Sequence, residues 1–411
     1  MAGFASTLGL MKVQRTAHRQ REAEIDPIAQ ARAVAPVIAD AAPRIEAACE
    51  LPDDVMAALH GAGLFRLLLP RALGGAELAP DRFAEVLDVI AQADASAGWC
   101  LNQTAVCSIT AVHLAPAVAR EIFGPPDAVL AWGIGPKAQA VAVDGGYRVT
   151  GVWSFGSGSR HATWLGGHCP VVEPDGTPRR HEDGKLLERT MLFPRASAEI
   201  DPRWDVIGLK GTGSDGYAVT DLFVPEQHSC SHLSRWHAVA NRELGIPYRF
   251  GATSLYAAGF AMVALGNARA MLNAFIVLAG AKTPRGLKHA MRDSPVVQMQ
   301  IAQAEAQLQS ARVYLVDLLA RCRESVGRVG QLTIDQRMTI RMASTYAIHQ
   351  ATEVVEAAYR AAGTTAIFES NPFERRFRDA YTISQHLQGR AMHFETVGKH
   401  LLGLEPEPLF L

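Results

Sequence analysis

The sequence contains few cysteines and no arrangement that would join them. None of the six forms a CxxC pair, and they are scattered along 411 residues at Cys49, Cys100, Cys107, Cys169, Cys230 and Cys322. Disulfide-stabilised secreted domains and cysteine-bound zinc sites need closer or more regular spacing. The pattern therefore argues against both classes and predicts a reducing, cytoplasmic location.

A long apolar run and an excess of one charge are also missing. The sequence has no run of eighteen or more consecutive apolar residues, the length that a membrane-spanning helix needs. Its 40 Lys and Arg residues nearly cancel its 41 Asp and Glu residues. Because nucleic acids and anionic membranes attract strongly basic proteins, neither is predicted as a partner.

The common catalytic motifs are absent as well. We find no HExxH, no P-loop and no GxSxG turn, and the 14 histidines show no metal-ligand spacing, so no metal site is predicted. Residues 211–216 match GxGxxG, but the strand-like residues 217–224 follow them. A dinucleotide-binding motif needs a helix at that point. We therefore expect a loop of a β domain and no nicotinamide site.

What the sequence does contain is a change of pattern along the chain, from helix to strand and back. Residues 140–143 and 147–153 alternate around a glycine turn and predict a hairpin. Apolar residues within 301–322 and 348–362 recur at spacings of three and four, as in antiparallel helix bundles. The predicted parts are an N-terminal tail over 1–25, a helical domain over 26–127, a β domain over 128–234 and a helical bundle over 235–411.

This order resembles the acyl-CoA dehydrogenase superfamily. The resemblance also includes the loop at Leu73-Gly74-Gly75 and the segment Arg376-Phe377-Arg378-Asp379-Ala380. It implies an α+β fold with an N-terminal helical domain, a central β-barrel-like domain and a C-terminal four-helix bundle.

Three motifs resemble the flavin-dependent monooxygenase branch of that superfamily, which includes oxygenase components acting on 4-hydroxyphenylacetate and dibenzothiophene. They are residues 94–99 (DASAGW), 153–158 (WSFGSG) and 378–386 (RDAYTISQH). The resemblance implies an oxidoreductase that hydroxylates a small aromatic substrate of the phenol or indole type with O2 and reduced FMN or FAD. It further implies a separate NAD(P)H-dependent flavin reductase as partner and a homotetramer.

The alternative function, acyl-CoA dehydrogenation or oxidation with bound FAD, requires a carboxylate base. In that family the base follows the Arg-Asp-Ala segment or lies on an early bundle helix. Here residues 380–394 contain no Asp or Glu, Gln388 stands near the expected place, and residues 244–292 are equally without acids. Oxygenation is therefore the preferred function. N- or S-oxygenation, and a scaffold without enzymatic activity, stay open.

By resemblance, three residues carry the catalytic roles. Ser157 would hydrogen-bond the flavin edge. His386 would stabilise negative charge developing on oxygen, because imidazole titrates near neutral pH. His113 would orient or deprotonate the substrate. The implied flavin contacts are Trp153 and Phe155 beside the ring, Thr212, Gly213 and Ser214 as loop donors, and Arg376 and Arg378 at a flavin phosphate, either of this subunit or of a neighbouring one. Each residue also has a purely structural alternative. Ser157 could be a turn residue, the two histidines could be packed in the core, the two aromatic residues could pack within the sheet, and the two arginines could form surface ion pairs.

Overall fold

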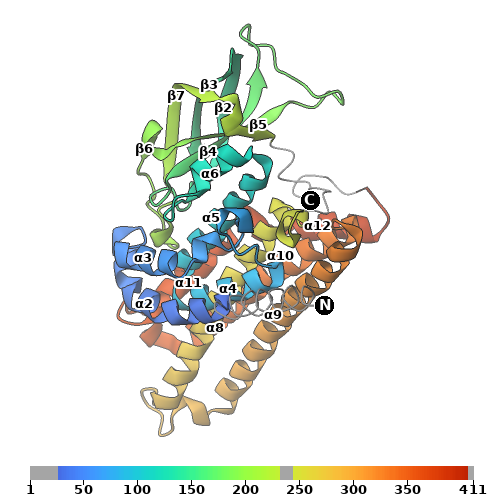
Figure 1. Ribbon diagram of the computed structural model, residues 1–411. Coiled ribbons are helices and arrows are strands. Elements are labelled where there is room, and N and C mark those ends of the chain that lie inside the picture. The colour runs from blue at the N-terminus through green and yellow to red at the C-terminus, as the bar shows by residue number, and fades with distance from the viewer. Residues whose placement is uncertain (1–25, 232–243, 406–411) are drawn as a thin grey trace, which may run out of the picture.

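The computed structural model describes residues 26–231 and 244–405. Figure 1 shows the strands gathered at one end of the molecule, shorter helices across the middle, and two long helices that project from the other end. The predicted N-terminal tail, residues 1–25, lies outside the described residues.

The N-terminal part of the described chain is helical. Its helices are α2 (Pro27–Ala48), α3 (Asp53–Gly61), η1 (Leu64–Arg66), η2 (Arg71–Leu73), α4 (Pro80–Ala93), α5 (Ala95–Ser108), η3 (Ile109–His113) and α6 (Pro116–Phe123). The Asp94 side chain begins α5 by accepting a hydrogen bond from Ala97 N at 3.0 Å. Such a cap stabilises a helix start by about 1 kcal/mol. All but one residue of α5 are buried, so this helix belongs to the core.

The central part is an eight-stranded sheet in which β6, β7, β3, β2, β4, β5 and β8 are neighbours in that order and β1 pairs with β4. The strands are β1 (Leu130–Trp132), β2 (Ile134–Val143), β3 (Gly146–Ser154), β4 (Trp164–Val172), β5 (Glu188–Pro194), β6 (Glu199–Asp201), β7 (Gly216–Pro225) and β8 (Ser229–Ser231). Short 3-10 turns, η4 (Arg195–Ser197), η5 (Lys210–Thr212) and η6 (Glu226–His228), connect them. β2 and β3 form the predicted hairpin, with Gly145 at φ 75° in its turn.

The C-terminal part is a helical bundle. It contains η7 (Ile246–Arg249), α8 (Ala252–Ala281), η8 (Met291–Asp293), α9 (Pro295–Val329), α10 (Ile334–Ala362), η9 (Gly363–Ile367), α11 (Pro372–Ser384), η10 (Leu387–Gly389) and α12 (Met392–Leu401). Helix α8 packs against α4, α5, α9, α10 and α11 and thus lies at the centre. The predicted apolar seam of α9 is buried from Ala304 to Cys322.

Helix α8 is more apolar than expected from the sequence, which has no long run of consecutive apolar residues. By length and composition alone it could cross a membrane, although its apolar run is interrupted by Asn267 and Arg269. Of its most apolar window, 61% is buried inside the protein. The high hydropathy of α8 therefore follows from its central place in the bundle, where neighbours surround it.

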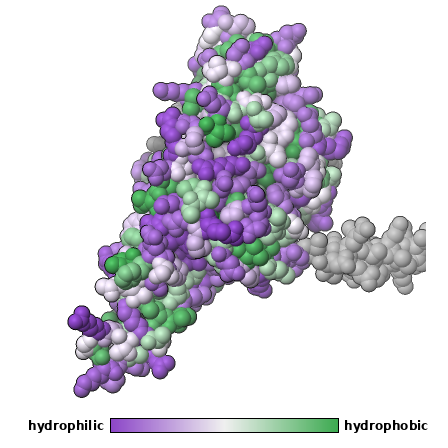
Figure 2. Space-filling model, turned by 90° about the vertical axis from the view of Figure 1, so that its left-hand side faces the viewer, coloured by the Kyte–Doolittle hydropathy of each residue, from purple (hydrophilic) through white to green (hydrophobic). Residues whose placement is uncertain are grey.

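The projecting end of the molecule carries exposed apolar side chains. Figure 2 shows green residues among polar ones on this end. Val277 is 74% exposed, Leu287 63% and Val296 57%. Exposed apolar groups that gather on one part of a surface are typical of contact sites.

The predicted fold is confirmed: helices, then a sheet, then a bundle follow one another in the predicted order. The proposed limits of the domains, at residues 127 and 234, stay a prediction.

Candidate active site

Ser157 lies in the turn after β3 and hydrogen-bonds across to the N-terminal helices. Its Oγ accepts a hydrogen bond from Trp99 Nε1 at 3.0 Å and lies 2.7 Å from Ser214 Oγ. All three side chains are buried. The first two of the three sequence motifs therefore meet in space, since Trp99 ends one and Ser157 belongs to the next.

The hydrogen bonds continue from Ser214 into the loop before β7. Ser214 Oγ lies 2.7 Å from Thr212 Oγ1, which donates to the carbonyl oxygen of Leu209 at 2.8 Å. Leu209 has a left-handed backbone, φ 53°, and its N–H donates to Asp379 Oδ1 at 2.6 Å. The Thr212 hydroxyl is directed to this backbone carbonyl, and Ser214 Oγ lies between it and Ser157. The prediction that Thr212 and Ser214 are loop donors to a flavin stays a prediction.

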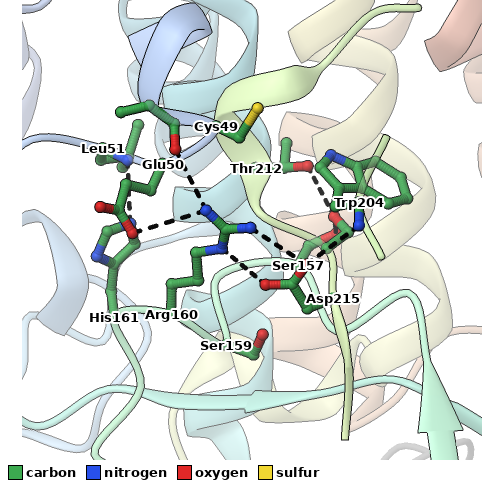
Figure 3. A network of polar contacts seen from close by, with 12 residues as sticks. Cys49, Glu50, Leu51, Ser157, Ser159, Arg160, His161, Trp204, Thr212 and Asp215 are labelled. Atoms are coloured by element: carbon green, nitrogen blue, oxygen red, sulfur yellow. Dashed lines mark hydrogen bonds and ion pairs between the residues drawn. The ribbon is translucent and has the colours of Figure 1, made fainter. Parts of the chain in front are cut away.

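An ion pair fixes the same loop to the end of α2. Arg160 Nε lies 2.7 Å from Asp215 Oδ2, and Arg160 Nη1 donates to Ala48 O at 3.2 Å. Figure 3 shows the Arg160 guanidinium between Asp215 and the segment around Cys49. Gly213 has φ 47°, and a Cβ there would lie 2.7 Å from Arg160 Cδ, so only glycine fits the turn. Gly213 thus shapes the loop, and a flavin contact by it stays a prediction.

Two aromatic rings, those of Phe260 and His386, contact Trp99. The ring centroids of Trp99 and His386 are 4.9 Å apart at an edge-on angle of 86°. Phe260 of α8 lies 4.0 Å from the Trp99 ring and 4.6 Å from the His386 ring. Tyr256, one turn earlier on α8, stacks on Phe260. Trp99 thus connects the first motif to the second through Ser157 and to the third through His386.

The environment of His386 changes its expected charge. Burial lowers the pKa of His386 to about 3, and the cations Arg341 and Arg390 lower it further. Its Nδ1 accepts a long hydrogen bond of 3.4 Å from Gln388 N, which leaves the ring proton on Nε2. This lowered pKa favours a neutral imidazole at physiological pH, with Nε2 as a hydrogen-bond donor. The role of His386 beside oxygen stays a prediction.

Gln388 lies at a position where even a carboxylate would be a poor base. It is buried, and its Oε1 accepts a hydrogen bond from Arg341. Burial lowers the pKa of Arg341 to about 10, so this guanidinium still carries its charge at neutral pH. The position after the Arg-Asp-Ala segment therefore holds a neutral amide paired with a cation, and it cannot take a substrate proton.

A polar network lies beyond the aromatic rings, between α5 and α8. The Tyr256 hydroxyl is 3.3 Å from Cys107 Sγ, and Gln103 Nε2 lies 3.4 Å from that hydroxyl. Asn102 is fully buried, and among the described residues neither atom of its amide has a hydrogen-bond partner. The sequence analysis missed Gln103, Tyr256 and Phe260. A spacing of four residues places Tyr256 and Phe260 on one face of α8, but core residues show the same spacing.

Trp153 and Phe155, the two residues predicted to lie beside the flavin ring, differ in their exposure. Trp153 is fully buried, and its ring stacks on Tyr217 at 5.4 Å within the sheet. Trp153 therefore packs within the sheet and is not the predicted contact beside the flavin ring. Phe155 is 62% exposed and meets Trp204 edge-on at 6.1 Å. Its place beside a flavin ring stays a prediction.

The two predicted phosphate ligands, Arg376 and Arg378, bind groups of the same chain. Arg376 is buried and donates to Gln92 O at 2.7 Å and to Asn267 Oδ1 at 3.3 Å. Arg378 pairs with Glu374 at 2.7 Å and with Glu46 at 2.5 Å. These bonds hold α11 to α4, α8 and α2. Their contact with a flavin phosphate, of this subunit or of a neighbouring one, stays a prediction.

His113 lies apart from the Trp99 rings. It ends η3, the continuation of α5, and is half-buried. The rise of an α-helix and a 3-10 helix places it roughly 20 Å along the axis from Trp99. Its predicted contact with a substrate stays a prediction.

Comparisons with known proteins agree with this geometry. Residues 258–390 match the family model described as acyl-CoA dehydrogenase, C-terminal domain. The chain is 32% identical over 365 residues to indole-3-acetate monooxygenase of Pseudomonas putida, covering 87% of this chain and 89% of that one. This chain belongs to the flavin-dependent monooxygenase branch of the acyl-CoA dehydrogenase superfamily. The predicted family and the oxidoreductase class are confirmed.

Further members of the branch match over nearly the whole chain. The oxygenase component of FADH2-dependent resorcinol hydroxylase from Rhizobium sp. (strain MTP-10005) is 27% identical, covering 95% of this chain and 98% of that one. The solved structure of XiaF from Streptomyces sp. in complex with FADH2 and glycerol has a TM-score of 0.87 at 26% identity. It covers 95% of this chain and 98% of that one. The whole architecture is therefore shared.

Proposed function

We propose that this member of the branch is the oxygenase component of a two-component monooxygenase that hydroxylates a small aromatic substrate. The observation that carries the proposal is that Ser157 and His386 both contact Trp99. A hydroxyl and a neutral imidazole offer hydrogen bonds without a base that could abstract a substrate proton. Such a site is suited to oxygen chemistry and unsuited to acyl-CoA dehydrogenation.

The residues at this site fit a reduced flavin. Bound reduced flavin would supply the two electrons needed to place one oxygen atom of O2 in the hydroxylated product and to reduce the other to water. His386 Nε2 would donate a hydrogen bond to oxygen that gains negative charge, and Ser157 would contact the flavin edge. Trp99 and Phe260 would exclude water from the reacting atoms. FMN and FAD carry the same ring, so these contacts would serve either cofactor.

The proposed substrate is an indole-type compound, with a phenol as the second choice. Tyr256, Phe260 and Trp99 form an aromatic surface on which a planar ring would stack. The Tyr256 hydroxyl and the Gln103 amide lie beside it and would bind a ring N–H or a hydroxyl group. The 32% identity to an indole-3-acetate monooxygenase supports the first choice. Dibenzothiophene monooxygenase, at 22% identity, supports the fold alone and leaves S-oxygenation an alternative.

Two partners belong to the proposal. The GxGxxG match precedes β7 rather than a helix, so a separate NAD(P)H-dependent reductase would deliver the reduced flavin. A homotetramer in the cytoplasm would cover exposed apolar side chains of the projecting end, such as Val277 and Val296.

The test mixes the protein with anaerobically reduced FMN or FAD and then with oxygenated buffer containing indole-3-acetate and 18O2. We expect a transient near-ultraviolet absorbance that outlasts the oxidation of free flavin, and one 18O atom in the product. Protein-free flavin is the control. Oxidation as fast as in that control, together with bleaching of bound oxidised FAD by an acyl-CoA, would contradict the proposal and favour a dehydrogenase.

A further inference from the structure

A series of hydrogen bonds joins the Leu209 carbonyl, Thr212, Ser214 and Ser157. Its direction is fixed because the carbonyl oxygen cannot donate. Thr212 Oγ1 lies 2.8 Å from the carbonyl oxygen of Leu209, which only accepts. Two oxygens at this distance repel each other unless a proton lies between them, so the Thr212 hydroxyl must donate to Leu209. A hydroxyl has one proton. Thr212 therefore accepts from its other neighbour.

The same argument passes along the series of hydroxyls. Ser214 Oγ is 2.7 Å from Thr212 Oγ1 and must donate to it. Ser157 Oγ, 2.7 Å from Ser214 Oγ, must then donate to Ser214. Trp99 Nε1 donates to Ser157 at 3.0 Å and uses one of its two lone pairs. Ser157 is left with one acceptor lone pair and no proton to offer a ligand.

This polarity matters because the two redox forms of a flavin differ at one ring edge. In the oxidised ring N5 has a lone pair and accepts a hydrogen bond. In the reduced ring N5 carries a hydrogen and donates. A serine that can only accept attracts the N–H of the reduced form and repels the lone pair of the oxidised form.

We propose that the hydroxyl series Ser157–Ser214–Thr212 makes this site selective for reduced flavin, by holding Ser157 as an acceptor for the N5 hydrogen. The inference rests on the proposed function, which requires a flavin beside Ser157. Thr212 and Ser214 are then positioning residues that act through Ser157. One neutral hydrogen bond changes binding by about tenfold, so we expect a ratio of dissociation constants, oxidised to reduced, of at least that size.

The decisive variant is Thr212→Val, which keeps the shape of the side chain and removes only its oxygen. Ser214 then loses its acceptor and can turn to donate to Ser157, which frees the Ser157 proton to face the flavin. The Leu209 carbonyl keeps Trp204 Nε1 as a donor at 3.1 Å. The matched control is Thr104→Val. Thr104 is a buried threonine whose hydroxyl donates to Cys100 O at 2.8 Å, within α5 and outside the series.

The experiment measures the dissociation constants of oxidised and anaerobically reduced FMN, and of the same two forms of FAD, for each protein. A second readout is the midpoint potential of the bound flavin. A tenfold preference for the reduced form raises a two-electron potential by about 30 mV. We expect Thr212→Val to bring the ratio of the two constants close to one and to abolish the rise in potential. Thr104→Val should leave both unchanged.

Several outcomes would overturn the inference. A parent ratio near one would mean that Ser157 accepts from a flavin N–H present in both forms, such as N3–H. An equal loss of affinity for both forms in Thr212→Val would indicate a structural role alone. Should Thr212→Val fail to fold, Ser214→Ala frees the Ser157 proton by another route and carries the same expectations. If the parent binds neither form, the proposed function itself fails, which separates the two results.

Discussion

The carboxylate of Asp379 accepts a hydrogen bond of 2.6 Å from the backbone N–H of Leu209, a residue 170 positions earlier in the chain. Leu209 holds a left-handed backbone, which costs a residue with a side chain about 1–2 kcal/mol. The bond helps to stabilise that conformation from α11. The Arg-Asp-Ala segment thus acts on the loop that carries Thr212 and Ser214.

This bond predicts a pH dependence of stability. Burial raises the pKa of the Asp379 carboxyl to about 7, and Asp94 raises it further. In unfolded chains an aspartate has a pKa of about 3.9. Between these values the folded protein holds a proton that the unfolded chain has released, so this group makes stability fall by a few kcal/mol as pH rises from about 4 to about 7. Thermal unfolding midpoints across this range should decline less steeply in Asp379→Asn. An unchanged slope would assign the titration to another group.

His386→Ala should uncouple flavin oxidation from product formation. The variant loses a neutral donor beside Trp99, so we expect at least a tenfold lower yield of hydroxylated product per reduced flavin, with hydrogen peroxide released instead. Because the pKa of His386 is lowered to about 3, protonation of this residue should not alter the parent's yield between pH 6 and 9. A matched control is His228→Ala, which removes a histidine of η6 whose Nε2 lies 3.0 Å from Glu121 of α6. Equal peroxide from both variants would remove His386 from its assigned role.

Gln388→Glu should not create an acyl-CoA dehydrogenase. The new carboxylate would face Arg341, whose charge favours the ionised form and lowers the pKa of the acid. A carboxylate stabilised in this way is a weak base, and it is bound to the guanidinium. The measurement is the bleaching of oxidised FAD by butyryl-CoA under anaerobic conditions. Any bleaching above that of the parent protein would mean that the base position is usable.

Gly259→Ala should destabilise the protein although alanine favours helices. A Cβ at this position would lie 1.9 Å from Asn102 Oδ1, so α5 and α8 would have to move apart. We expect a loss of about 1–3 kcal/mol in the free energy of unfolding, the usual cost of overpacking. Asn102→Ala, which removes the clashing amide, should restore most of this loss in the double variant. Additive effects in the double-mutant cycle would show that the two residues do not share the contact.

The sequence predicted the fold well because its signals are local. The hairpin around Gly145, the start of α5 at Asp94 and the seam of α9 each depend on residues a few positions apart. The high hydropathy of α8 was not predicted because Asn267 and Arg269 interrupt its apolar residues, so no long consecutive apolar run marks the helix.

The site was predicted less completely because its contacts join distant segments. Ser157 and His386 were identified through motifs, but the pKa of His386 depends on its burial and on Arg341, which no local pattern reveals. Arg376 has the residue type of a phosphate ligand, yet its bonds to Gln92 and Asn267 show a structural role. Charge and exposure are properties of the packed chain, so they separate such alternatives where residue type cannot.

The loop over residues 209–215 is held from two sides, by Asp379 through Leu209 and by Arg160 through Asp215. Its conformational entropy is thus lost when the protein folds rather than when a ligand arrives. Free reduced flavin is short-lived in air, so an oxygenase that receives it by diffusion gains from a site that needs no ordering step. Capture should then proceed in one kinetic phase whose rate rises linearly with protein concentration.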